Sequence, residues 1–169
     1  NLAWAKRMGA SGYETARSVT TDSAGNVYTI GVFGGTVDFD PNAGTTNLTS
    51  VGSNDIFIQK LDASGDLVWA KSIGSTNVDN GESIAVDLFG NIYITGFFKD
   101  TIDFDPNSGT VSVTATGGQD VFVEKLDASG NLVWVKTMGG FGNDYAQGLA
   151  VDSVGNVCVI GTFADIVDF

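Results

Sequence analysis

The chain has 169 residues, a mass of 17.6 kDa and a formal net charge of −12, with one cysteine and no histidine. Such an acidic chain lacks the basic patch that nucleic acids and anionic membranes require, and no apolar run reaches the roughly 18 residues of a membrane span, so we expect no nucleic-acid partner and no membrane insertion. The missing histidine removes the usual general base, and a single cysteine excludes a disulfide framework or a thiolate zinc site.

The chain repeats with a period of 65 residues, without insertion or deletion. Three tryptophans, each followed two positions later by lysine, mark this period: Trp4, Trp69 and Trp134. Self-similarity at a fixed spacing predicts a repeat architecture. We divide the chain into a permuted repeat unit 1–65, a second unit 66–130 and a partial unit 131–169, all parts of one larger assembly of repeats, and we interpret the chain as an excerpt of a longer polypeptide.

If the repeat is followed from Gly81, it is predicted to begin with two strands joined by a tight turn. In the second unit these strands are residues 82–87 and 92–98, both rich in β-branched side chains. Asp-x-x-Gly-Asn lies between them and recurs at Asp22–Asn26 and Asp152–Asn156. The aspartate can accept hydrogen bonds from the amides that follow it, and the glycine supplies a positive φ, so the pattern predicts a hairpin turn.

An outer hairpin and two more strands complete the unit. Residues 101–105 and 111–116 are predicted to form the hairpin, and residues 120–126 and 132–136 the two strands. Strands 92–98 and 120–126 carry apolar residues at odd and even positions alike, which indicates that both faces of the sheet are covered.

We therefore predict an all-β fold in which β-propeller blades of antiparallel strands repeat every 65 residues and the propeller is incomplete. Two alternatives fit less well. The coils of a parallel β-helix are much shorter than this period, and separate sandwich domains would each need about 100 residues and a linker. An open series of blades would expose faces that are meant to be buried, so we expect the remaining blades or another protein chain as a partner.

A family resemblance supports the same fold. The stretch from Gly139 to Val157, followed by Gly161 and Asp168-Phe169, resembles the bacterial seven-bladed β-propeller repeat called SBBP, and residues 120–126 continue the likeness. Its turns are also similar to those of NHL propeller repeats. The resemblance implies a secreted or cell-surface bacterial protein whose propeller is a scaffold or adhesive region, and it supplies no catalytic residues. The sequence departs from the common pattern after Asp-Phe, where it reads Asp-Pro-Asn-x-Gly-Thr.

This departing segment is the main candidate for a metal site. Asp-x-Asp-x-Asn places oxygen ligands at alternate positions, as at the start of an EF-hand loop, and such oxygens suit Ca²⁺. The match is partial, because the glycine comes one position late and threonine replaces the bidentate glutamate. The alternative, which we favour, is a hairpin turn capped by its own aspartate. The six candidate ligands are Asp38, Asp40, Asn42, Asp103, Asp105 and Asn107.

Other candidates have simpler structural explanations. The tryptophans could stack on carbohydrate, but their place in apolar strands at the repeat period favours packing between blades. Cys158 occupies the position of Tyr28 and Tyr93, so we expect it to pack in the core and not to act as a nucleophile.

We predict that the chain is a non-enzymatic, structural or binding propeller segment of a large secreted or cell-surface bacterial protein, acting as a scaffold or adhesin. No cofactor is expected apart from Ca²⁺ at the outer hairpins, and carbohydrate is a candidate partner. The alternative is a carbohydrate-active or other hydrolytic propeller enzyme with its site in the central channel. Near-identical units speak against that alternative, because an active site needs different residues from different blades.

Overall fold

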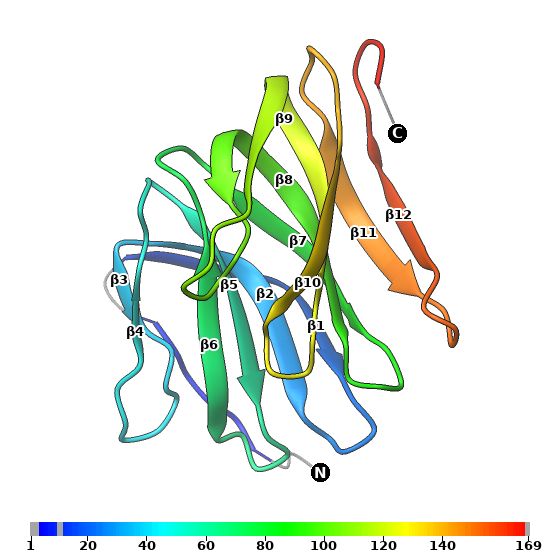
Figure 1. Cartoon of the computed structure of the whole chain (residues 1–169). Coiled ribbons are helices and arrows are strands. Elements are labelled where there is room, and N and C mark those ends of the chain that lie inside the picture. Colours follow the sequence, from blue (N-terminus) through cyan, green and yellow to red (C-terminus); the bar gives the residue numbers. More distant parts are fainter. Residues whose placement is uncertain (1–3, 10–11, 168–169) are drawn as a thin grey trace.

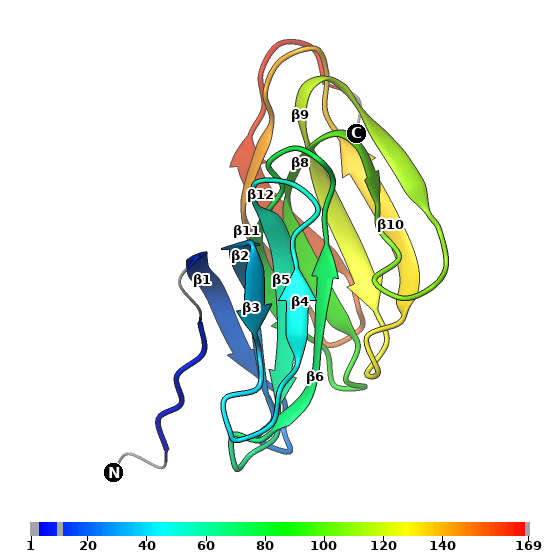
Figure 2. The same ribbon diagram turned by 90° about the vertical axis from the view of Figure 1, so that its left-hand side faces the viewer.

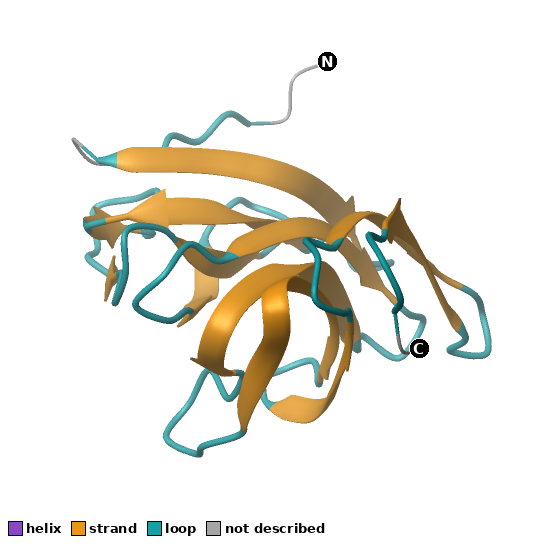
Figure 3. Ribbon diagram, turned by 90° about the horizontal axis from the view of Figure 1, so that it is seen from above, coloured by secondary structure: helices purple, strands orange, loops and turns teal. Residues whose placement is uncertain are grey.

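The computed structural model describes residues 4–9 and 12–167, and in these residues every regular element is a strand (Figures 1 and 3). The first sheet, blade 1, contains β1 (Tyr13–Thr21), β2 (Val27–Gly34), β5 (Asp55–Leu61) and β6 (Leu67–Ile73). Blade 2 contains β7 (Asn80–Val86), β8 (Ile92–Asp103), β9 (Ser112–Leu126) and β10 (Leu132–Met138). Blade 3 contains β11 (Tyr145–Val151) and β12 (Val157–Thr162). A small outer hairpin consists of β3 (Thr36–Asp38) and β4 (Asn47–Thr49).

The blades are antiparallel sheets that stand side by side (Figure 2). Within blades 1 and 2, the strands neighbour one another in chain order and pair antiparallel, which short hairpin turns permit. The first strands of the three blades, β1, β7 and β11, lie beside one another, and we call them the inner strands. The sheets do not close into a ring. The predicted incomplete all-β propeller is therefore confirmed.

The inner strands are linked by one contact that recurs from blade to blade. Ser18 Oγ on β1 accepts a hydrogen bond from the Ile84 amide on β7 at 3.4 Å. Ser83 Oγ on β7 accepts one from the Leu149 amide on β11 at 3.1 Å. The same displacement thus relates each blade to the next.

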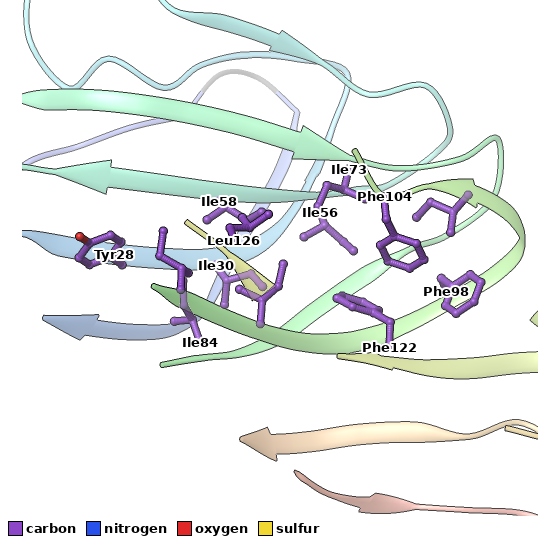
Figure 4. Close-up of a cluster of buried hydrophobic side chains, with 13 residues drawn as sticks. Tyr28, Ile30, Ile56, Ile58, Ile73, Ile84, Phe98, Phe104, Phe122 and Leu126 are labelled. Atoms are coloured by element: carbon purple, nitrogen blue, oxygen red, sulfur yellow. The ribbon is translucent and has the colours of Figure 1, made fainter. Parts of the chain in front are cut away.

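The largest core lies between blades 1 and 2 (Figure 4). Blade 1 contributes Tyr28, Ile30 and Ile58, and blade 2 contributes Ile94 and Phe122, all of them fully buried. Burying one such side chain stabilises a fold by about 1.5–3 kcal/mol. The joint between two blades is therefore the main apolar core, which explains why β5 and β8 are apolar on both faces.

The outer hairpin is built differently in the two complete blades. In blade 1, Gly35 has a φ of 79°, and the chain breaks there into β2 and β3. In blade 2 the equivalent residue is Asp100, with a φ of 58°, and β8 continues through it to Asp103 with a register shift. The predicted outer hairpin of the second unit is therefore an extension of β8 and β9.

One packing prediction is wrong. Cys158 is exposed, whereas Tyr28 and Tyr93 at the equivalent positions are buried. In blade 1, Trp69 and Lys60 of the outer strands cover the Tyr28 ring. Blade 3 has only β11 and β12 in the described part of the chain, so no such strands cover Cys158. None of the described residues forms a helix long and apolar enough to cross a membrane.

Candidate functional site

The predicted metal ligands lie in the outer hairpins, where aspartate oxygens cap their own turns. Asp38 Oδ1 accepts hydrogen bonds from the amides of Asp40 at 3.0 Å and Thr46 at 2.8 Å. Both hydrogen bonds lower the pKa of Asp38, and the bond from Thr46 has the larger effect. In blade 2, Asp103 Oδ1 accepts the equivalent bonds from Asp105 and Val111. The hairpins therefore have the self-capped turn that we favoured.

Asn42 and Asn107 connect each outer hairpin to the tryptophan–lysine segment that precedes its blade in the chain. Lys6 Nζ donates to Asn42 Oδ1, and Lys71 Nζ on β6 donates to Asn107 Oδ1. The amide of Asn107 also donates to the carbonyl of Gly130 at 3.4 Å. These asparagines thus act as clamps between successive repeats.

Calcium binding at these hairpins stays a prediction. In each hairpin the structure brings two aspartates and one asparagine into a single turn, with the hydrogen bonds described above. In residues 4–9 and 12–167, no three His, Cys, Asp or Glu side chains gather as a metal-binding group. Thermal melting with millimolar Ca²⁺ and a chelator control would test the prediction.

Trp4 and Trp69 each contact the blade that follows them in the chain. Trp4 Nε1 donates to the Ala63 carbonyl in the β5–β6 turn at 3.0 Å. A Cβ on Gly65 in that turn would lie 3.1 Å from the Trp4 ring. Trp69 packs against the core between blades 1 and 2. The indoles of Trp4 and Trp69 therefore serve as packing anchors between blades.

A different feature lies on the inner strands, where each carries a β-bulge at the same place. The register shifts between Ala16 and Ser18, between Gly81 and Ser83, and between Ala146 and Gly148. The extra residues, which we call the bulge row, are Arg17, Glu82 and Gln147. A bulge removes its extra residue from the strand ladder and changes the direction of its side chain.

A glycine on the paired strand accommodates each bulge. A Cβ on Gly31 would lie 2.1 Å from the Thr15 carbonyl oxygen, and one on Gly96 would lie 1.8 Å from that of Asn80. Gly161 of blade 3 is equally close to a backbone oxygen, at 2.2 Å. Only glycine fits where two backbones approach so closely.

The bulge row differs in chemistry from blade to blade. Arg17 and Gln147 are exposed, and Glu82 is partly buried. Arg17 Nε lies 4.0 Å from Glu82 Oε1. Burial raises the pKa of Glu82, and the nearby Arg17 guanidinium partly opposes that rise. The row therefore offers a cation, a carboxyl group and an amide on neighbouring strands.

The bulge row was not predicted from the sequence, because its three residues differ and a comparison of the units for identical residues passes over them. Two signals could have found it. A glycine inside an otherwise apolar strand indicates a bulge, and each unit has one, at Gly31, Gly96 and Gly161. The residue that differs in charge among aligned units then marks the bulge position.

The hairpin turns gather at one end of the molecule, the lower end in Figure 1. Asp22 Oδ1 accepts hydrogen bonds from the amides of Ala24 and Asn26, each at 3.0 Å, and Oδ2 accepts one from the Tyr28 hydroxyl. Burial works to raise the pKa of Asp22, but these bonds together with that from the Asn26 side chain lower it on balance. Asp87 is held in the same way.

Between the turns of blades 1 and 2 lies a cavity of about 290 Å³, bordered by Asp22 and Asp87. The turn tips differ between blades. Blade 1 presents Ala24 there, and blade 2 presents Leu88 and Phe89, which are 78% and 81% exposed. This end thus combines a uniform aspartate frame with variable tips.

A family model described as the SBBP beta-propeller repeat matches residues 3–32 and 68–96. These two stretches are SBBP beta-propeller repeats. Each SBBP match spans a joint, from the tryptophan–lysine strand of one unit through the inner strand to the bulge glycine, Gly31 or Gly96. Asp168-Phe169, part of the resemblance described above, lies outside the described residues.

The chain is also similar to two longer proteins, of which one is named as a repeat protein. An uncharacterised WD repeat-containing protein of Acanthamoeba polyphaga mimivirus is 28% identical over 113 residues, covering 59% of this chain. The regulatory protein FlaEY of Caulobacter vibrioides is 29% identical over 150 residues, covering 87% of this chain. The chain spans only 8% and 15% of the lengths of these two proteins.

Proposed function

We propose that the chain is a binding scaffold, a propeller segment with uniform blade joints and with ligand contacts at the bulge row. One observation carries this proposal. The lysine–asparagine clamp, the turn aspartates and the bulge glycines recur unchanged, whereas the bulge row reads Arg17, Glu82 and Gln147. A constant frame that carries a chemically variable row on neighbouring strands is an arrangement that repeat proteins use to present a binding surface.

Binding is favoured over hydrolysis by the composition of the row. Glycoside hydrolysis generally uses two carboxyl groups on either side of the scissile bond. Within the bulge row only Glu82 is acidic, and its neighbour is Arg17. The row is better suited to hydrogen bonds with a polar partner. The printed names of the two relatives, a WD repeat-containing protein and a regulatory protein, are compatible with a scaffold role.

The test is to screen the purified chain on a peptide array and a glycan array and to measure the affinity of the strongest hit. We expect Arg17→Ala with Glu82→Ala to weaken binding at least tenfold. The matched control is Val68→Ala with Val133→Ala, on the outer strands, where both valines are about half exposed (51% and 52%). Equal affinity of the two double variants would show that the bulge row is not the binding surface.

We also propose that the protein works outside the cell or on the cell surface, as an adhesin-like module of an exported bacterial protein. The basis is the resemblance of its repeats to those of exported propeller proteins. Protease treatment of intact cells of the source organism should remove the protein while a cytoplasmic marker survives. Protection of the chain until the cells are lysed would reject an external location.

A further inference from the structure

Two buried aspartates lie at each joint between blades, at the end opposite the hairpin turns. In the joint between blades 1 and 2 they are Asp55, at the start of β5, and Asp79, just before β7, with exposed fractions of 1% and 0%. In the joint between blades 2 and 3 they are Asp120 and Asp144, at 5% and 0%. We call each of these sets a joint pair. Fully buried aspartates are uncommon and require compensating partners.

Backbone amides hold each member of the first joint pair in place. Asp55 accepts hydrogen bonds from the amides of Val51 at 2.8 Å and Gly52 at 3.3 Å. Asp79 accepts them from Ser75 at 2.6 Å and Lys99 at 3.3 Å. The backbone amide of Asp79 also donates to the carbonyl of Asn54, directly before Asp55. Each carboxyl group therefore fixes the loops around it, and a backbone hydrogen bond joins the two positions.

The second joint pair repeats this arrangement with one difference. Asp144 accepts from the amides of Gly140 and Ala164, at 2.9 and 2.7 Å. Asp120 Oδ2 accepts from the Thr116 amide at 2.9 Å, but Asp120 Oδ1 is buried without a hydrogen-bond partner. A buried polar atom without a partner carries a desolvation cost that no interaction offsets.

The joint pairs are not neutralised by cations. None of the four aspartates forms a salt bridge within the described residues. In the first joint, Lys99 donates only its backbone amide, and its side chain is exposed. The charged residue that follows it in the sequence is Asp100, which is also exposed. In the second joint, the charged side chain nearest in sequence to the Ala164 contact is another acid, Asp165. Each pair therefore meets mainly negative charge.

Burial raises the pKa of three of these aspartates, and for two of them the charge of a neighbouring aspartate adds to the rise. Burial raises the pKa of Asp55. Burial raises the pKa of Asp79 and of Asp120 as well, and the charge of the partner, Asp55 or Asp144, adds to the rise. Two carboxylates that share a buried site resist being ionised together.

We propose that each joint pair is a pH-sensitive fastening between blades, which takes up a proton on mild acidification and then holds the joint more tightly. The proton removes one of the two buried negative charges and so relieves the repulsion between them. In the unfolded chain, an aspartate takes up this proton only near its ordinary pKa of about 3.9. The free energy of unfolding therefore rises as the pH falls through the raised folded-state pKa values. The gain is complete once the pH is below the pKa of the unfolded chain.

The pH window is closed on the acid side by the turn aspartates. Hydrogen bonds hold the pKa of Asp22 and of Asp87 below the ordinary value, although burial works in the opposite direction. The stability that these two aspartates contribute is present above the pKa of the unfolded chain. It is lost as the pH falls through their folded-state pKa values. We therefore expect maximal stability of the chain at mildly acidic pH.

The decisive variant is Asp120→Asn. The asparagine oxygen can keep the bond from Thr116, and the substitution removes the buried negative charge whose Oδ1 has no partner. Urea unfolding of the full chain should be measured from pH 4.5 to 8. We expect the wild-type unfolding constant to fall at least tenfold from pH 8 to pH 5, since one unit of raised pKa corresponds to a tenfold change. D120N should unfold less readily than wild type at pH 7 and show a shallower pH dependence.

The matched control is Asp66→Asn, which removes one charge from an exposed side chain. It should leave the pH slope of the wild type unchanged. A D120N slope equal to that of the wild type, or a wild-type stability that decreases steadily from pH 8 to pH 5, would overturn the proposal. So would stabilisation of the wild type by millimolar Ca²⁺ that D120N abolishes, because a metal ion and not a proton would then join the pair.

A second measurement remains decisive if D120N does not fold. Carbon-13 NMR titration of the wild-type aspartate carboxyl groups should show at least one member of each joint pair titrating above the ordinary aspartate range. If all four titrate at or below about 3.9, the joint pairs do not take up a proton in the folded state.

Discussion

Blades 1 and 2 share their strand order and clamps, but one fully buried position carries an amide in blade 1 and a carboxyl group in blade 2. β5 carries Gln59, whose Nε2 donates to the Phe39 carbonyl at 2.7 Å. β9 carries Glu124 at the same place, and both of its carboxyl oxygens are buried without a partner among the described residues. Burial raises the pKa of Glu124 well above its usual range, and the charge of Asp105 adds to this rise.

This difference separates what the blade fold requires from what it tolerates. Glutamine and glutamate have nearly the same shape, so the exchange changes little of the packing at this position. The chemistry differs, since glutamine always has a hydrogen-bond donor for the adjoining hairpin, whereas glutamate has one only when it is protonated. Blade 2 should therefore be the more pH-sensitive of the two blades.

The largest effect is expected where the blades must be the same, at the bulge glycines. Gly31→Ala and Gly96→Ala both place a Cβ against a carbonyl oxygen, so each should destabilise the chain by about 3 kcal/mol, the upper end for overpacking. Gly148→Ala is the control, because its Cβ would meet only the side chain of Ile160 at 3.3 Å. Urea unfolding measures all three. A small cost at only one of the two bulge glycines would show that the blades do not depend equally on the bulge.

An exchange at the position that differs should have the next largest effect. Glu124→Gln should stabilise the chain at pH 7 by about 1–3 kcal/mol, the cost of leaving a buried polar group unsatisfied, and Gln59→Glu should destabilise it by a similar amount. The folded-state pKa of Glu124 is raised, so its contribution is fully favourable below the unfolded value and is lost as the pH rises. Denaturation at pH 5, 7 and 9 should show the benefit of E124Q growing with pH. A benefit independent of pH would show that Glu124 is not a proton carrier.

The sequence was informative about the frame and uninformative about the points where blades differ. The repeat period, the apolar pattern of β8 and the Asp-x-x-Gly-Asn turns predicted the blades and their hairpins, because these features depend on local chemistry and burial. The lysine partners of Asn42 and Asn107 lie in the segment that precedes each blade, and the neighbour of Glu82 lies on β1. Such contacts depend on how sheets stack, which no local pattern describes.

A moderate and equal effect is expected at the turns of the two blades. Asp22→Ala and Asp87→Ala each leave backbone amides and a tyrosine hydroxyl without their acceptor, and each should cost about 1–2 kcal/mol. The cost should shrink at low pH, because the lowered pKa of either aspartate makes its contribution disappear on protonation. Thermal melting at pH 7 and pH 3 measures it. Unequal costs at pH 7 would show that the tip residues Leu88 and Phe89 contribute to turn stability in blade 2.

The smallest effect is expected at the clamps, where the salt dependence of the cost should differ between the two blades. Lys6→Met and Lys71→Met each remove one hydrogen bond to asparagine and should cost about 0.5 kcal/mol, as is usual for exposed charged contacts. Lys6 also lies 3.8 Å from Asp66, so the cost of Lys6→Met should fall in 1 M salt. Lys71 has no salt bridge among the described residues, and the cost of its replacement should change less. If salt reduced both costs equally, the clamp would be a general electrostatic attraction between blades and not a specific lysine–asparagine hydrogen bond.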